Sequence, residues 1–290
     1  MPNRLFIVDV FAESPLAGNQ LAVVVGGDDL SDETKQLVAA EMNFSETTFV
    51  APAPGRDGGY RVRLFTPARE IAFAGHPILG TAWVVRHHVA PGASGPVRLE
   101  LPVGPIAVTF DADGTAWFVA PPVSAGRTVD RARIVSALGL APGDLDAEAP
   151  ARQYSAGTSA LVVPLRGLDA LRRARLDLGA FAPLAAEGFP PLVYVFCRET
   201  HRAENDLGAR FFFEAHGVRE DPATGNGAAF LGNYLLEHRL LGAGPLDLRI
   251  EQGHEVRRPS LVRLRAREVG GAREVSVGGG VLPVVRGELL

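Results

Sequence analysis

Three polar residues in this sequence stand where they could move a proton. Glu46 lies in the segment MNFSETTFV between Phe44 and Phe49, at a predicted helix-to-strand junction. It can be interpreted as an exposed turn glutamate, or as one capped by Ser45. It can also be a carboxylate partly removed from water, which suits a general base. The local sequence leaves both interpretations open.

His76 is the second candidate, because it follows Gly75 at the start of an almost uncharged apolar run. A lone histidine at such a position can be purely structural. Alternatively, the helix start disfavours the charged imidazolium, which suits a neutral hydrogen-bond donor or proton carrier.

Asp221 is the third candidate and comes directly before Pro222 and the turn Thr224–Gly227. An aspartate with this turn chemistry can simply mark the entry to a helix. Asn226, flanked by two glycines, is a candidate cap for the helix that follows.

The segments around His76 and Asp221 look like two copies of one sequence motif. The first, Phe65–Val85, reads FTPAREIAFAGHPILGTAWVV, and the second, Phe213–Leu236, reads FEAHGVREDPATGNGAAFLGNYLL. Upstream, AGNQLAVVV at Ala17–Val25 matches AGTSALVVP at Ala156–Pro164 without gaps. This repeat predicts two pseudo-symmetric domains with a site in the cleft between them.

The helices that must position these residues are predicted over Pro77–Val89 and Ala228–His238. Both are apolar on nearly every face, so each must be surrounded by protein, most simply in the middle of a curved sheet. The free N–H groups at the start of each helix would then offer a site for a carboxylate.

The order of strands and helices does not fit repeated βαβ units, so we expect an α+β fold with largely antiparallel sheets. We place the first half at residues 1–123 and the second at 124–279. Val281–Val285 is a candidate to cross back to the first half, so that 280–290 would complete it.

Composition excludes several classes of protein. The formal net charge of −4 gives no reason to expect nucleic acid or an anionic membrane as partner. We see no signal peptide and no apolar run long enough to span a membrane, and therefore expect a cytoplasmic protein. Lys35 lies in an amphipathic segment and is expected to be solvated, which argues against a Schiff-base enzyme.

Metal and thiol chemistry are not indicated by the spacing of the candidate ligands. Cys197 is the only cysteine and lies in an apolar run, so we interpret it as a buried core thiol. The other histidines show no metal-ligand spacing and are interpreted as surface or packing residues: His87, His88, His201, His216, His238 and His254.

Taken together, these segments resemble the PhzF-like family of phenazine biosynthesis, within the diaminopimelate-epimerase-like fold. The matching segments are VDVFAESPLAGNQLAVVV, NFSETTFV, FTPAREIAFAGHPILGTA and VREDPATGNGAA, in the family's order across nearly the whole chain. The resemblance implies two similar domains, each with a sheet around a central helix, an active site between them, a homodimer and cofactor-free chemistry.

Carried over by motif, Glu46 is similar to the family's acid/base residue, and His76 and Asp221 to its hydrogen-bonding and proton-handling partners. The resemblance also implies a set of substrate-binding residues at or near the helix starts: Asn19, Gly75, Thr224, Gly225 and Asn226. Many relatives have Ser where this chain has Asn226. An amide can bind but cannot relay a proton as a hydroxyl might, so a binding role is expected.

Related racemases of this fold use a pair of cysteines, one in each half. By the repeat alignment the equivalent positions are Ala74 and Thr224, which excludes a two-thiol epimerase. We therefore expect a cofactor-independent isomerase that moves a proton in a small carboxylate substrate, in bacterial secondary metabolism. Two alternatives stay open: an epimerase that uses Glu46 and Asp221 as opposed groups, and a binding protein without catalysis.

Overall fold

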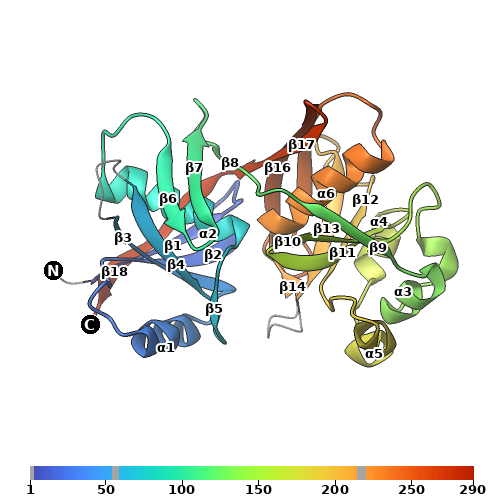
Figure 1. The fold of residues 1–290 in the computed structure, drawn as a ribbon, viewed down its shortest axis with the longest axis horizontal. Helices are drawn as coiled ribbons and strands as arrows, with labels where there is room; N and C mark the ends of the chain where they lie inside the picture. Colours follow the sequence, from blue (N-terminus) through green and yellow to red (C-terminus); the bar gives the residue numbers. More distant parts are fainter. Residues whose placement is uncertain (1–2, 54–58, 214–219) are drawn as a thin grey trace. The chain divides into compact units, whose positions relative to one another are not determined.

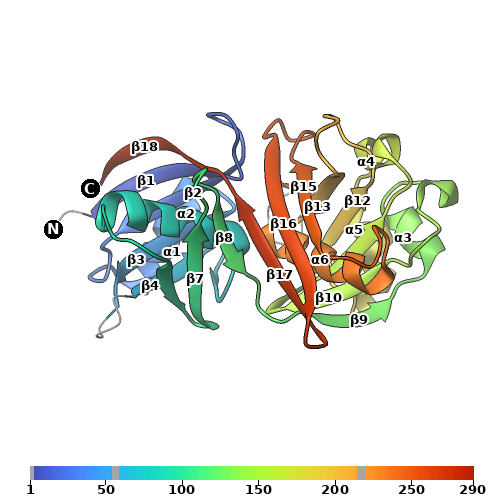
Figure 2. The ribbon, with the colours of Figure 1, turned by 90° about the horizontal axis from the view of Figure 1, so that it is seen from above.

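The computed structural model describes residues 3–53, 59–213 and 220–290. Residues 214–219 of the second copy of the sequence motif, which include His216, lie outside the described part. The chain divides into two units. Unit 1 comprises Met1–Val119 with Gly278–Leu290, and unit 2 comprises Ala120–Val277. The predicted limits of the halves were 123/124 and 279/280. Figures 1 and 2 show the strands and helices of each unit.

The described residues of unit 1 form a mixed sheet with two α-helices. Its strands are β1 (Asn3–Val10), β2 (Asn19–Val25), β3 (Glu46–Pro52), β4 (Tyr60–Phe65), β5 (Glu70–Ile71), β6 (Val97–Leu101), β7 (Gly104–Phe110), β8 (Ala116–Val119) and β18 (Val281–Leu289). Its helices are α1 (Asp32–Met42) and α2 (Gly75–Val84), which continues as a π-helical turn over Val85–Val89. The final strand, β18, runs antiparallel to β1.

Unit 2 is built from the same kinds of element. Its strands are β9 (Ser124–Thr128), β10 (Arg152–Ala156), β11 (Thr158–Pro164), β12 (Val193–Cys197), β13 (Leu207–Phe212), β14 (Glu220–Asp221), β15 (Leu246–Gln252), β16 (Ser260–Val269) and β17 (Ala272–Gly279). Its helices are α3 (Arg131–Ala137), a 3-10 turn over Pro142–Asp144, α4 (Leu168–Arg173), α5 (Leu178–Ala186) and α6 (Gly225–His238).

The strand pairing repeats from unit 1 to unit 2. In unit 1, β1–β2 is antiparallel, β2–β3 parallel, β3–β4 and β4–β5 antiparallel, β4–β6 parallel and β6–β7 antiparallel. In unit 2, the same sequence of directions runs through β10–β11, β11–β12, β12–β13, β13–β14, β13–β15 and β15–β16. The α+β class with mainly antiparallel pairing is confirmed.

The two apolar helices are enclosed, as their composition predicts. All residues of α2 except Trp83 are buried, and the helix contacts β1, β2, β3, β6, β7 and β8 of its own unit. Gly80 allows this approach, since a Cβ there would lie 2.6 Å from the Leu21 side chain. In unit 2, α6 packs against β10, β11 and β16, and Gly225 and Gly227–Leu236 are buried. Among the described residues, no helix is both long and apolar enough to cross a membrane.

The local predictions for the start of α1 and for Cys197 hold, and the prediction for Lys35 is wrong. Ser31 caps α1 by accepting from the Thr34 N–H, as the start signal predicts. Cys197 is buried in the core of unit 2, and burial raises the pKa of its thiol to about 11. Lys35 is not solvated: it is buried, because its Nζ turns back to donate to the Leu30 carbonyl at 2.6 Å.

Candidate active site

Glu46 and His76 come together inside unit 1. Glu46 is the first residue of β3, and His76 is the second residue of α2. His76 Nδ1 lies 3.4 Å from Glu46 Oε2, and the two side chains are only 3% and 7% exposed. The interpretation of Glu46 as an exposed turn residue is therefore wrong. A carboxyl group and an imidazole therefore lie next to each other away from bulk water.

Burial keeps His76 neutral. It lowers the pKa of the imidazole to about 3, while a hydrogen bond with the backbone of Gln20 acts in the opposite direction. The dominant cause is thus loss of water around the ring, rather than the helix start that the sequence suggested. A neutral imidazole carries one proton and one lone pair, so it can accept from one group while donating to another.

Asn19 and Glu46 lie at the same ring nitrogen of His76. Asn19 stands on strand β2, beside the strand of Glu46, and its amide lies 3.3 Å from His76 Nδ1. His76 Nε2 is buried and has no hydrogen-bond partner among the described residues. Asn19 therefore helps to hold the ring with Nδ1 toward Glu46.

The second group of candidates lies in unit 2. Asp221 ends β14 and is buried, and it accepts a hydrogen bond from Thr224 Oγ1 at 2.6 Å. Gln252 braces this turn, because its Nε2 donates to the Asp221 carbonyl at 2.9 Å and to Thr224 Oγ1 at 3.1 Å. Thr224 is the residue that precedes α6, in the position that Ala74 occupies before α2.

Asn226 makes the contact in unit 2 that His76 makes in unit 1. Its Nδ2 donates to Thr158 Oγ1 at 3.3 Å, and Thr158 stands in β11 where Asn19 stands in β2. The expected side-chain cap is absent: within the described residues, no side chain caps the start of α6. Asn226 instead reaches across to the neighbouring strand.

Strand register shows that the catalytic candidates are not duplicated. Thr48, Leu64 and Ile71 face one another across β3, β4 and β5, and Tyr194, Phe211 and Asp221 do so across β12, β13 and β14. Asp221 therefore corresponds to Ile71. By the same register Glu46 corresponds to Leu192, the residue before β12. Each carboxylate has an apolar counterpart in the other half.

Tyr194 is a candidate that sequence reasoning missed. It is fully buried, and its hydroxyl has no hydrogen-bond partner among the described residues. Burial raises its pKa, and the charge of nearby Asp221 raises it further. The only signal in the sequence was a tyrosine inside the otherwise apolar run of β12, which is also typical of a core residue.

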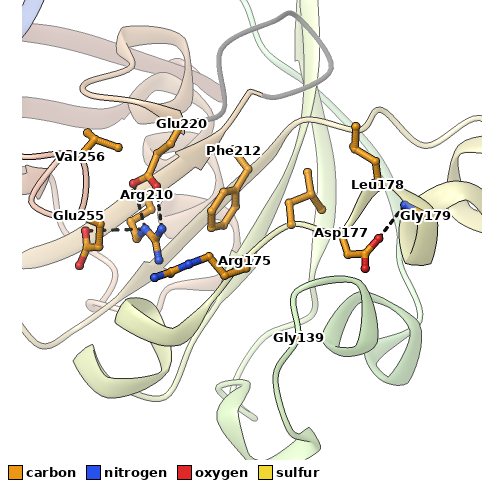
Figure 3. A pocket seen from close by; sticks show the side chains of 11 residues that line it. Gly139, Arg175, Asp177, Leu178, Gly179, Arg210, Phe212, Glu220, Glu255 and Val256 are labelled. Carbon is orange, nitrogen blue, oxygen red and sulfur yellow. Dashed lines mark hydrogen bonds and ion pairs between the residues drawn. The ribbon is translucent and has the colours of Figure 1, made fainter.

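An ion pair holds β14, the two-residue strand that carries Asp221. Arg210 on β13 donates to both carboxylate oxygens of Glu220, at 2.9 and 2.7 Å, and both side chains are buried. The pair lies at a pocket of about 830 Å³ in unit 2 (Figure 3). No predicted site residue lines this pocket. Its charged groups are engaged, since Arg175 donates to backbone carbonyls and Asp177 caps α5.

Comparison with known proteins places the chain in a family. The profile of phenazine biosynthesis-like proteins (PhzC-PhzF) matches residues 8–287. The trans-2,3-dihydro-3-hydroxyanthranilate isomerase of Pseudomonas aeruginosa is 37% identical over 281 residues, covering 94% of this chain and 93% of the relative. An uncharacterized isomerase of Mesorhizobium japonicum is 35% identical, covering 100% and 99%.

Solved structures agree on the fold. A predicted epimerase from Pseudomonas aeruginosa superposes with a TM-score of 0.82 at 30% identity, over 99% of both chains. A PhzF-family protein of Bacillus anthracis reaches 0.89 at 24% identity, over 100% of this chain and 99% of that one. A probable proline racemase from Agrobacterium radiobacter, at 0.62 and 12% identity, shares the fold. The predictions of a diaminopimelate-epimerase-like fold and of an isomerase are confirmed, and the chain belongs to the PhzF-like family of phenazine biosynthesis-like proteins.

Proposed function

We propose that this protein is a cofactor-independent isomerase that moves a proton, and with it a double bond, in a small carboxylate-bearing substrate. The observation that carries the proposal is the buried contact of 3.4 Å between Glu46 and a neutral His76. A carboxylate removed from water beside a proton acceptor is suited to take up a proton and release it again.

In the proposed reaction, Glu46 removes a weakly acidic C–H proton next to the substrate carboxylate or along a conjugated system. The electron pair moves into the conjugated system, and the double bond shifts. Glu46, now protonated, or His76 then delivers a proton to a different carbon, after exchange of that proton with solvent. Positioned acid/base groups of this kind contribute about 10²–10⁴-fold.

We assign Asp221 to the same reaction as a second proton-handling group. We assign substrate binding to Asn19, Gly75, Thr224, Gly225 and Asn226. Support comes from the N–H groups at the first turns of α2 and α6, which favour a carboxylate and can stabilise developing negative charge. In the repeat, Glu46 and Asp221 correspond to the apolar residues Leu192 and Ile71. This difference favours a mechanism with one base and a proton relay over a mechanism with two equivalent bases.

The first substrate to test is trans-2,3-dihydro-3-hydroxyanthranilate, which the name of the Pseudomonas aeruginosa relative gives. At 37% identity that substrate is a starting point, and other unsaturated, amino-acid-derived carboxylates belong in the same screen.

A second candidate function is epimerisation at one stereocentre, with Glu46 and Asp221 as opposed groups. It is favoured by the predicted epimerase that is 30% identical to this chain. Turnover in D₂O, followed by NMR, separates the two. Deuterium at a carbon that gains a C–H bond while the double bond moves indicates the isomerase. Deuterium at a carbon that only inverts indicates the epimerase, and binding without any exchange indicates a protein that has lost the chemistry.

The decisive variant is Glu46→Gln, which keeps the size of the side chain and removes the base. We expect turnover to fall to the detection limit while the folded structure persists. Glu41→Gln is the matched control, because Glu41 lies exposed near the end of α1. If Glu46→Gln turns over at the wild-type rate, Glu46 is not the base.

We also propose that the protein acts as a homodimer in the cytoplasm, in bacterial secondary metabolism and without nucleic-acid or membrane partners. Family membership supports the dimer, and sedimentation of the purified chain measures it. Enzymes encoded beside it in the genome would indicate the pathway.

A further inference from the structure

Two loops of unit 2 bring together three side chains of the kind that bind transition metals. His201 lies in the turn between β12 and β13, Glu251 near the end of β15, and His254 in the turn before β16. His201 Nδ1 is 3.1 Å from Glu251 Oε2, and His254 Nε2 is 3.7 Å from the same oxygen. One nitrogen of each ring and one carboxylate oxygen all lie within 4.8 Å of one another.

Hydrogen bonds within the protein hold the carboxylate of Glu251 in place. Its Oε1 accepts from Asn205 Nδ2 at 2.6 Å and from the Arg202 N–H at 2.9 Å, and its Oε2 accepts from the His201 N–H at 2.7 Å. Asn205 is held in turn by Arg249, whose Nε donates to its Oδ1 at 2.8 Å. Metal ligands are oriented by such a surrounding set of hydrogen bonds.

The separations fit a small tetrahedral ion. Bonds of about 2.0–2.1 Å to nitrogen and oxygen place the ligand atoms of zinc roughly 3.3 Å apart. The distances of 3.1 and 3.7 Å around Glu251 Oε2 bracket that value. The rings now stack, with centroids 3.8 Å apart and planes 14° from parallel, so each must turn about its Cβ–Cγ bond to point at one ion. Solvent gives room for this turn, because the two side chains are 21% and 26% exposed.

We propose that His201, Glu251 and His254 form a Zn²⁺ site that ties the β12–β13 turn to the β15–β16 turn, with water completing the coordination. The site stabilises unit 2 and takes no part in the isomerase chemistry proposed above. His201 lies 50 residues before Glu251 along the chain, which is why the spacing of histidines predicted no metal.

The test uses the full chain after treatment with a chelator and dialysis. Titration with ZnCl₂ in a buffer that does not bind metal should give one site of micromolar or tighter affinity. At a hundredfold excess of Zn²⁺ over the dissociation constant, Tm should rise by roughly 5 °C. Co²⁺ at the same site should give the visible absorption of a four-coordinate complex.

His201→Ala and His254→Ala should each weaken Zn²⁺ binding at least tenfold and remove the rise in Tm. Both side chains are partly exposed, so both variants should fold. His87→Ala, which removes an exposed histidine of unit 1, should bind as the wild type does. If the wild type binds no Zn²⁺, or if the two variants bind as tightly as the wild type, the three residues form a hydrogen-bonded cluster without a metal and the proposal is wrong.

Discussion

Arg210 and Glu220 form a two-pronged ion pair in unit 2, and Arg63 and Glu70 form the same pair in unit 1. In each case an arginine on the longer strand donates from Nε and Nη2 to both oxygens of a glutamate on a two-residue strand. The two pairs differ in burial. The side chains are 2% and 5% exposed in unit 2, but 27% and 38% exposed in unit 1. The repeat thus preserves the same ion pair in both units. It is buried in unit 2 and partly exposed to water in unit 1.

Arg210→Ala is expected to be far more destabilising than Arg63→Ala. Removing Arg210 leaves the Glu220 carboxylate buried without its partner, which typically costs about 3–5 kcal/mol. Removing Arg63 exposes Glu70 to water, and surface pairs are worth at most about 1 kcal/mol. Urea unfolding of the two variants measures both values. A further variant, Arg210→Met with Glu220→Leu, should regain much of the loss; equal effects at both sites would contradict the account.

The sequence repeat predicted this architecture well because its signals are local. Glycine before a polar residue and an apolar run marked the starts of α2 and α6, and lack of a polar face predicted that strands would surround both helices. These features depend on neighbouring residues only. The same reasoning chose His76 and Asp221, which lie at or just before these helix starts, whereas Glu46 was chosen at a predicted helix-to-strand junction and by family resemblance.

Contacts across strands could not be predicted in this way. Asn19 lies 57 residues from His76, and Thr158 lies 68 residues from Asn226. Strand register creates both contacts, and register depends on the pairing of distant segments. Separation along the chain also hid the contact of His201 with Glu251, which lies 50 residues away. The prediction that Lys35 is solvated was wrong for a different reason. Its flexible side chain folds back and donates to the Leu30 carbonyl.

His76 should make the protein less stable in weak acid. Its pKa is about 3 in the folded protein and about 6.5 when unfolded, so the unfolded state binds the proton first as pH falls. The contribution is complete above pH 6.5 and declines progressively toward pH 3, by at most about 1.4 kcal/mol per pH unit.

The measurement is the free energy of unfolding in urea at several pH values between 7.5 and 5. His76→Gln cannot take up this proton, so its stability should fall less steeply than that of the wild type. His88, His238 and His254 also have a lowered pKa, but they are present in both proteins and cancel in the comparison. Parallel curves for the two proteins would show that His76 is protonated in the folded state as readily as in the unfolded one.

The contacts of Asn19 and Thr158 should affect the kinetic constants differently. Asn19→Ala releases His76 Nδ1 and removes a side chain to which we assign substrate binding, so we expect kcat to fall about tenfold and KM to rise. Thr158→Val removes the acceptor of Asn226, for which we propose only a binding role, so KM should rise with kcat nearly unchanged. Steady-state kinetics on an accepted substrate measures both constants. If both variants lower kcat by the same factor, or if neither lowers it, Asn19 and Asn226 do not differ in this way.

Tyr194→Phe separates a functional hydroxyl from a structural one. The Tyr194 hydroxyl is buried beside Asp221 and has no hydrogen-bond partner within the described part of the chain. Removing a hydroxyl that makes no hydrogen bond should leave stability unchanged or raise it by about 1 kcal/mol. We expect kcat/KM to fall at least tenfold nevertheless, because the hydroxyl beside Asp221 can donate to a bound substrate. Tyr234→Phe is the control, since its hydroxyl already donates to the Pro150 carbonyl at 2.9 Å and its loss should lower stability without changing turnover. A Tyr194→Phe protein that is less stable but fully active would make Tyr194 an ordinary core residue.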